Sequence, residues 1–353
     1  MNDSESTEWM ILSQFLRDYL NRFMVYRMDF AFNKGAFSFA GQTRNLNTIQ
    51  YQGKSYNLGP LLRRMMIPST ISIGGDFVVG CDFEILAPGE KSLHEQASLS
   101  IFDAANHGYE AFFLADHIRG ILLNVLDAHI RGNRKIENSL FVEVNELMKG
   151  PVTQALVNGT NPARSSRTKG AVGLHGQFHV DTADFNFVCT GMPLFYYCSH
   201  QDQFYYLEPY SGPPLGYFTP QSAFYKPYVP HSLRLAPGDY LFLATDGCFD
   251  VPWDEGRPPF GLPNRPVRHF KYPPNASMDV MRGFEPSIAT KKNLPEMADP
   301  SLSSFCFLLQ SQLARKTSPH AMVEATLDAL EASPLFDHDD KSLIAIHALD
   351  EGR

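Results

Sequence analysis

Four aspartates follow or precede short apolar segments, at positions where their carboxylates could meet in the folded chain. The segments read ISIGGDF, SLSIFDAANHG, YLFLATDG and DHDDKSLIAI, and they contain Asp76, Asp103, Asp246 and Asp339. Each aspartate adjoins a glycine or a tight turn, so any one of them alone would be explained as an ordinary turn residue. The four together predict converging carboxylates, provided that the strands carrying them are neighbours in a sheet.

Converging carboxylates would have a defined chemistry. Like charges at close range raise one another's pKa values and destabilise a fold unless a positive charge lies among them. Carboxylate oxygens are hard ligands that suit Mg²⁺ or Mn²⁺, whereas zinc is bound mainly by histidine and cysteine. A pair of such cations can hold hydroxide and polarise a phosphoryl group. The pattern therefore indicates a divalent-metal site with hydrolytic chemistry.

Helices and strands occur in blocks along the chain. Apolar residues at helical spacing predict helices at 8–28, 109–130, 137–149, 302–314 and 319–332. Segments rich in aromatic and β-branched residues predict a meander of antiparallel strands between 185 and 245, and SLIAIHAL predicts a last strand at 342–349. Helices before and after a run of strands indicate an α+β layered domain.

The composition is that of an ordinary globular protein and limits the possible partners. The chain of 353 residues is 44% hydrophobic and 19% charged, and its net charge of −8 argues against binding to nucleic acid. Its five cysteines form no C-x-x-C pair, which favours a reducing compartment over a disulfide framework or zinc site. The acidic N-terminus is unlike a signal peptide, and no apolar run approaches the roughly 20 residues of a membrane span. We therefore expect a cytoplasmic protein with neither a nucleic-acid nor a membrane partner.

Five stretches, in order, resemble motifs of the SpoIIE-type phosphatases, a bacterial branch of the metal-dependent protein phosphatases related to protein phosphatase 2C. IGGDFVVG is similar to G-G-D-[FY], and DAANHGYEAFFLADHIRGIL is similar to D-x-x-G-H-G-x-x-A. CTGMPLFYYC and the later PPLGYF follow A-G-H-P-P and P-L-G. LAPGDYLFLATDGCFD and DDKSLIAI match L-x-x-G-D-x-L-x-L-x-T-D-G-x-x-[DE] and D-D-x-T. The resemblance runs from about residue 60 to the C-terminus.

The resemblance implies a four-layer α-β-β-α sandwich of two antiparallel sheets flanked by helices, with two Mn²⁺ or Mg²⁺ ions at one edge. It implies that Asp103 bridges both ions and that the backbone carbonyl of Ala104 adds a ligand. Asp246 and Asp339 would hold the second ion, and Asp76 would bind metal directly or through water. The implied reaction is in-line attack of a metal-held hydroxide on a phosphoserine or phosphothreonine, with no phosphoenzyme.

Several positions depart from the family pattern. Val79 stands in place of a second acid, Asn106 in place of the glycine before His107, Met192 in place of the histidine of G-H-P, and Ser342 in place of a threonine. None of these changes removes one of the four principal carboxylates. Two interpretations stay open: an active phosphatase, and a catalytically weakened pseudophosphatase that binds a phosphoprotein or another partner.

Two neighbouring residues also have alternative roles. His107 could be a general acid for the leaving alkoxide, which would add it to Asp76 and Asp103 as a candidate catalytic residue. It could equally fix the start of the helix that follows. Asp340 could orient the adjacent candidate ligand Asp339.

The motifs divide the chain into an N-terminal helical segment at 1–60 and a phosphatase domain at 61–353, with a proline-rich insert at about 252–300. The helix predicted at 8–28 could regulate the enzyme or join a homodimer, or it could pack on its own core. Between Arg257 and Lys292 the insert carries seven basic and two acidic residues, which predicts either a substrate-recognition flap beside the metal edge or a solvated loop. By resemblance, the substrate is a phosphoprotein of a bacterial partner-switching pathway, such as an anti-sigma-factor antagonist.

Overall fold

The computed structural model describes residues 29–44, 48–51, 54–57, 74–86, 93–104, 109–131, 138–148, 170–209, 212–216, 227–250, 258–272, 277–278, 299–315, 318–336 and 339–349. The helix predicted at 8–28 and the candidate catalytic residue His107 lie outside these ranges.

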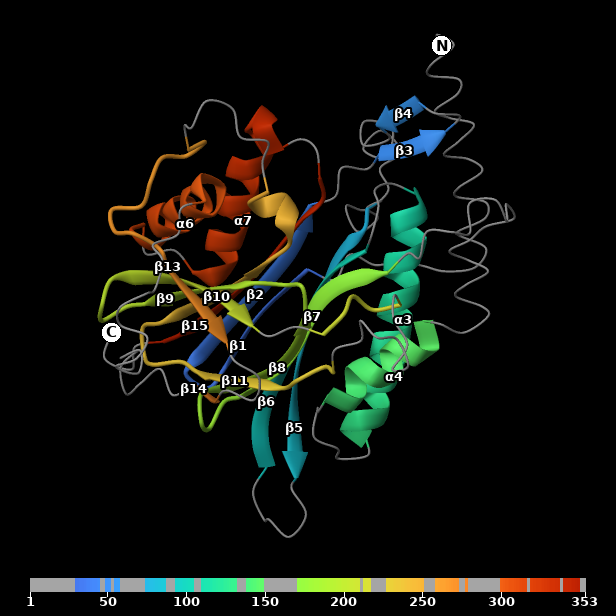
Figure 1. The fold of residues 1–353 in the computed structure, drawn as a ribbon. Coiled ribbons are helices and arrows are strands. Elements are labelled where there is room, and N and C mark those ends of the chain that lie inside the picture. The colour runs from blue at the N-terminus through green and yellow to red at the C-terminus, as the bar shows by residue number, and fades with distance from the viewer. Residues whose placement is uncertain are drawn as a thin grey trace.

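Two β-sheets pack face to face in the middle of the molecule (Figure 1). In order across the first sheet, the strands are β1 (Phe30–Lys34), β2 (Phe37–Arg44), β15 (Lys341–Ala348), β12 (Tyr240–Ala244), β9 (Leu194–Cys198), β10 (Gln203–Pro209) and β13 (Arg268–Tyr272). Across the second sheet they are β14 (Ser277–Met278), β11 (His231–Arg234), β8 (Asp184–Thr190), β7 (Ala171–His179), β6 (Leu93–Ala104) and β5 (Asp76–Leu86). A separate hairpin is formed by β3 (Thr48–Tyr51) and β4 (Lys54–Asn57).

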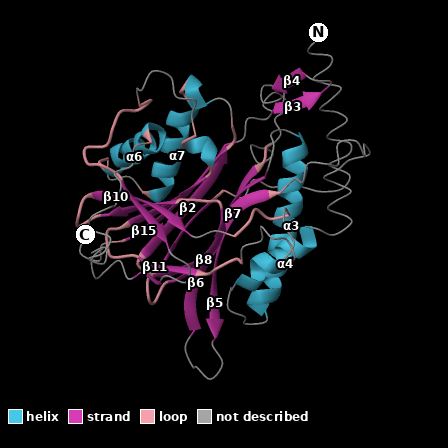
Figure 2. Cartoon of the chain, viewed as in Figure 1, coloured by secondary structure: helices cyan, strands magenta, loops and turns pink. Residues whose placement is uncertain are grey.

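Helices cover the outer face of each sheet (Figure 2). The second sheet is covered by α3 (Tyr109–Arg131) and α4 (Asn138–Met148), and the first by α6 (Pro300–Leu313) and α7 (Pro319–Glu331). Two short 3-10 helices, η2 (Asp246–Cys248) and η4 (Pro334–Phe336), also pack on the first sheet's side. The order of layers is therefore α-β-β-α, as predicted.

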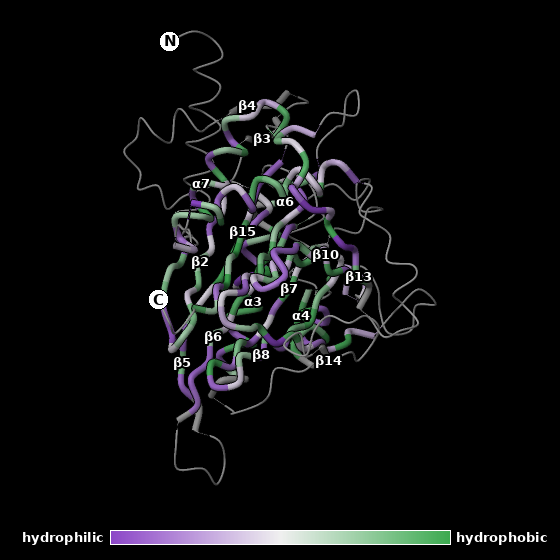
Figure 3. Tube along the Cα trace, turned by 90° about the vertical axis from the view of Figure 1, so that its left-hand side faces the viewer, coloured by the Kyte–Doolittle hydropathy of each residue, from purple (hydrophilic) through white to green (hydrophobic). Residues whose placement is uncertain are grey.

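Alternation along the strands builds these layers. On β5, Val78 points into the cluster between the sheets, whereas Phe77 and Val79 point into the cluster beneath α3 and α4. On β12, Leu243 faces the other sheet and Phe242 faces α6 and α7. Strands covered on both faces need apolar residues on both, which explains their nearly continuous apolar sequences. In Figure 3 hydrophobic colour accordingly predominates in the central strands, while the outer ends of β5 and β6 are hydrophilic.

The helices begin where the sequence provides caps. The carboxylate of Asp299 accepts hydrogen bonds from the backbone N of Ser301 and Leu302 at the start of α6. The hydroxyl of Ser318 accepts from the backbone N of Ala321 at the start of α7. In both helices a proline occupies the first position, where its missing N–H costs nothing. None of the described helices combines the length and the apolar character that a membrane crossing requires.

The strands between 185 and 245 do not form a single meander. β8 and β11 belong to one sheet, and β9, β10 and β12 to the other. The sheets are antiparallel except at one edge of each, where β13 pairs with β10 and β14 with β11 in parallel. β7 was missed by the sequence analysis because AVGLHGQFH interrupts its apolar residues with glycine and histidine.

The first sheet also includes strands that precede residue 61, where the phosphatase domain was predicted to begin. β2 pairs with β15 along its whole length, from Phe37 opposite Ala348 to Arg44 opposite Lys341. Residues 30–44 therefore contribute two strands to the sandwich, and the boundary predicted at residue 61 falls inside the fold.

Candidate metal centre

The ends of four strands bring the predicted aspartates to one edge of the sandwich. β5 begins at Asp76 and β6 ends at Ala104, and their antiparallel register places Asp76 opposite Asp103. In the other sheet, the end of β12 lies beside the start of β15, with Ala244 opposite Leu343. Asp246 follows β12 and Asp339 precedes β15, so both stand at that end of their sheet.

Thr245 joins the two sheets at this edge. Its hydroxyl donates a hydrogen bond of 2.6 Å to Oδ2 of Asp76, which lies in the opposite sheet. The hydroxyl oxygen of Thr245 also accepts a bond of 2.8 Å from the backbone N of Ser342. The hydroxyl of Ser342 in turn lies 2.8 Å from that of Thr43 on β2. The serine found here in place of a threonine thus keeps the hydroxyl that the network uses.

The electrostatics of this edge favour a cation. Burial is the main cause of a pKa for Asp76 well above its usual range, and the nearby carboxylates of Asp103, Asp340 and Asp339 raise it further. The hydrogen bond from Thr245 acts in the opposite direction. Carboxylates gathered in this way are stabilised by added positive charge, and their hard oxygen atoms suit Mg²⁺ or Mn²⁺. The donor set therefore fits the predicted ions.

The predicted site residues differ in exposure. Asp76 is buried, Asp103 and Asp339 are half-buried, and Asp246 is exposed in η2. Ala104 is buried, and its backbone N donates to the carbonyl oxygen of Gly75 at 3.0 Å, which ties the end of β6 to the residue before Asp76. The structure thus brings the candidate ligands to one edge, from both sheets.

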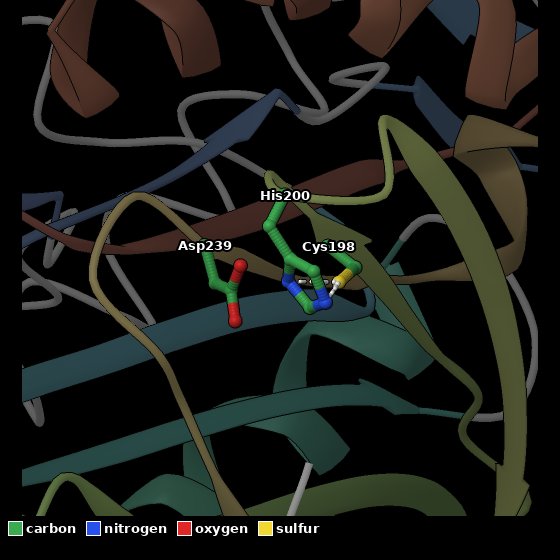
Figure 4. Close-up of side chains that lie close together, drawn as sticks. All are labelled: Cys198, His200 and Asp239. Atoms are coloured by element: carbon green, nitrogen blue, oxygen red, sulfur yellow. Dashed lines mark hydrogen bonds between the residues drawn. The ribbon is translucent and has the colours of Figure 1, made fainter. Parts of the chain in front are cut away.

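No three of the predicted carboxylates have oxygen atoms that all lie within 4.8 Å of one another. Among the residues that the structure describes, one group of metal-ligating side chains is that compact, and it consists of Cys198, His200 and Asp239 (Figure 4). This group lies at the other end of the first sheet, because antiparallel β9 places Leu194 beside Leu243 and runs away from the carboxylate edge to Cys198.

Asp239 already has a structural role in that group. Its Oδ1 accepts from the backbone N and the hydroxyl of Ser199 at 2.9 and 3.1 Å. Its Oδ2 accepts from the backbone N of Ala236 at 2.9 Å and from the hydroxyl of Tyr196. Four donors account for the lone pairs of both oxygens, so Asp239 ties the turn before β12 to the turn after β9.

The proline-rich insert does not place Arg265 at the carboxylate edge. Nη1 of Arg265 donates to the carbonyl oxygen of Gln201 at 2.6 Å, and its Nε lies 3.6 Å from Oδ2 of Asp202. Both partners are in the β9–β10 turn, at the opposite end of the sheet. For Arg265 the predicted flap position is therefore wrong; the side chain of Lys271 lies outside the described residues.

Sequence reasoning missed the contributions of Thr245, Ser342 and Thr43. Thr245 was visible as the residue before Asp246, but its partner Asp76 lies 169 positions away. Ser342 was noted only as a departure from the family pattern. The available signal was a hydroxyl residue within three positions of a candidate ligand, in both T-D-G and D-D-K-S.

Comparison with sequence models of protein families identifies the family to which these motifs belong. The sequence model described as Stage II sporulation protein E (SpoIIE) matches residues 94–281, which is 188 of the 353 residues. The chain belongs to the SpoIIE family. The predicted family is therefore confirmed, and the members of this family are serine/threonine phosphatases of the PP2C type.

One solved structure with the same architecture supports the fold, and a second one is similar over most of this chain. The RsbU and RsbW domains of Rv1364c from Mycobacterium tuberculosis align with 93% of this chain and 64% of theirs, at 17% identity and a TM-score of 0.54. This chain thus spans less than two thirds of that protein. The SiaA-PP2C domain of Pseudomonas aeruginosa aligns with 78% of this chain and 81% of its own, at 16% identity and a TM-score of 0.47. Comparison with curated protein sequences gave no significant match.

Proposed function

We propose that this SpoIIE-family chain is an active metal-dependent phosphatase that hydrolyses phosphoserine or phosphothreonine on a bacterial signalling protein of the partner-switching type. The observation that carries the proposal is the meeting of Asp76, Asp103, Asp339 and the Thr245–Asp246 turn at one edge of the sandwich. A buried carboxylate surrounded by other carboxylates is costly to maintain, and a cation site accounts for it.

The residues that would hold two Mn²⁺ or Mg²⁺ ions are Asp103 and the carbonyl of Ala104, Asp246 and Asp339, with Asp76 binding directly or through water. When bound, such ions supply the positive charge that activates water and polarises a phosphoryl group. Thr245 orients Asp76 through its hydrogen bond, and the apolar layers behind β5 and β6 hold Asp76 and Asp103 in register. His107 remains a proposed general acid or helix-fixing residue.

Two of the four departures from the family pattern, Val79 and Met192, lie in the apolar core, which favours activity over the pseudophosphatase alternative. Val79 is 2% exposed and packs in the cluster beneath α3 and α4, on the face of β5 opposite Asp76 and Val78. Met192 is buried between the sheets. Asn106 lies outside the described residues.

The test is hydrolysis of an aryl phosphate by the purified full chain, with Mn²⁺ and with a chelator. We expect Asp103→Asn and Asp246→Asn to lower turnover by at least about 100-fold, because each removes a ligand charge from the centre. Asp82→Asn is the matched control, since Asp82 is an exposed carboxylate on β5 whose Oδ2 lies 3.7 Å from Nζ of Lys34. Substantial turnover in both site variants, or in chelator, would reject the assignment. A wild-type chain that binds a phosphoprotein without turnover would favour the pseudophosphatase.

The partner is proposed to be a phosphorylated protein, with an anti-sigma-factor antagonist as the expected type. A homodimer through the helix predicted at 8–28 is a further proposal, and we propose that the phosphatase domain itself begins at β1. Deleting residues 1–28 leaves β1 intact and tests the dimer by light scattering. An unchanged molar mass would remove the case for a dimerising helix.

A further inference from the structure

Asp340 stands directly before β15 and directly after the candidate ligand Asp339, and it is 3% exposed. Its Oδ2 accepts a hydrogen bond of 2.7 Å from the backbone N of Gly75, the residue before Asp76. The carbonyl of Gly75 in turn accepts from the backbone N of Ala104 at 3.0 Å. One carboxylate thus connects the start of β15 to the segments that carry Asp76 and Asp103.

The backbone of Asp340 makes two further contacts with candidate ligand segments. Its N donates to Oδ1 of Asp339 at 2.8 Å, which fixes that side chain relative to the strand. Its carbonyl oxygen lies against Gly247, so closely that a Cβ at position 247 would overlap it. The turn that presents Asp246 is therefore seated directly on Asp340.

We infer that Asp340 is a positioning residue, which holds the segments of Asp76, Asp103, Asp246 and Asp339 at the spacing that a divalent cation needs. The inference rests on the proposed function only through the metal centre. A carboxylate that accepts a backbone N–H is a strong, directional anchor in a buried setting. Residues that orient metal ligands in this way typically change metal affinity by about 10–100-fold when they are removed.

The positioning role of Asp340 requires an oxygen that accepts a hydrogen bond, whereas direct ligation of a cation requires the charge of the carboxylate. Asparagine at position 340 keeps an oxygen that can accept from Gly75 N, while alanine removes it. A positioning role therefore predicts that Asp340→Asn retains metal binding and Asp340→Ala loses it. A residue that ligates the cation through its charge would be damaged by both substitutions.

The experiment is calorimetric titration of Mn²⁺ into the full chain, with no substrate present. We expect Asp340→Ala to weaken Mn²⁺ binding by about 10-fold or more and Asp340→Asn to stay within about threefold of the wild type. Asp82→Asn is the control, because it makes the same change in a carboxylate of β5 that lies away from the carboxylate edge, with its Oδ2 3.7 Å from Nζ of Lys34. It should leave Mn²⁺ affinity unchanged. Hydrogen exchange around residues 74–76 in chelator should be faster in Asp340→Ala alone.

Wild-type Mn²⁺ affinity in Asp340→Ala, or equal losses in both variants at position 340, would overturn the inference. If the alanine variant does not fold, Asp340→Asn decides, since a loss beyond tenfold contradicts an acceptor role. A wild type that binds Mn²⁺ but hydrolyses no phosphate rejects the proposed function and leaves this inference standing. A wild type that binds no Mn²⁺ overturns both.

Discussion

Replacing Thr245 with valine removes one hydroxyl and nearly preserves the shape of the side chain. That hydroxyl donates to Asp76 and accepts from the backbone N of Ser342, at 2.6 and 2.8 Å, and all three residues are buried. Leaving the Ser342 N–H unpaired costs about 1–3 kcal/mol, and losing a hydrogen bond to a charged group costs about 1.5–3 kcal/mol. We expect Thr245→Val to lower the free energy of unfolding by about 3–5 kcal/mol.

Two variants serve as comparisons for that value. Thr245→Ser keeps the hydroxyl and loses one methyl group, so it should cost only about 1 kcal/mol. Thr190→Val makes the same change at a buried threonine whose hydroxyl has no hydrogen-bond partner within the described part of the chain, and it should be neutral or stabilising.

The assay is urea unfolding of the full chain in chelator, with midpoints compared at equal slope. If Thr245→Val were as stable as Thr245→Ser, the link between the sheets would contribute little, and the reasoning from its hydrogen bonds would be refuted.

Three further changes test other parts of the centre. Gly247→Ala places a Cβ against the carbonyl oxygen of Asp340, so it should destabilise the chain by about 3 kcal/mol or more, measured by the same urea assay; wild-type stability would contradict the close contact. Asp76→Asn should stabilise the metal-free chain, because it removes a buried charge from among other carboxylates. Since the folded pKa of Asp76 is raised, the wild type loses stability as pH rises above the unfolded value of about 3.9, and the advantage of the variant should grow over the same range. Added Mn²⁺ should raise the Tm of the wild type more than that of Asp76→Asn, and equal shifts would exclude Asp76 from metal binding. Arg265→Glu should leave kcat/KM on a phosphoprotein within about threefold of wild type, since Arg265 contacts the β9–β10 turn; a large selective loss would restore it to a recognition flap.

The sequence was sufficient to predict the candidate ligands, because their positions depend on residues close to them in the chain. Asp76, Asp103, Asp246 and Asp339 each adjoin a strand, and that position follows from apolar runs and glycines within a few residues. The blocks of helices and strands were likewise sufficient for the layer order, because helical and extended segments have different apolar periods.

The pairing between distant segments could not be predicted from local sequence patterns. Alternation along β8 or β9 indicates a buried strand but says nothing about which sheet it joins, so the two sheets were merged into one meander. The hydrogen bond from Gly75 to Asp340 spans 265 residues, and nothing near either residue in the sequence indicates the other. β1 and β2 were missed for the same reason, since their membership in the first sheet depends on β15, some 300 residues further along.

The parallel strands β13 and β14 have a consequence for the behaviour of the protein in solution. Both come from the proline-rich insert, yet β13 completes the border of one sheet beside β10 and β14 completes the border of the other beside β11. A bare border strand presents a row of N–H and C=O groups to which another molecule can add a strand. One segment of the chain thus covers β10 and β11 and leaves two short strands, of five and two residues, as the borders, which limits self-association through a bare sheet edge. The strands themselves, RHFKY and SM, contain no proline, but Pro273 and Pro274 follow β13 directly in the sequence, and neither has an N–H to offer an incoming strand.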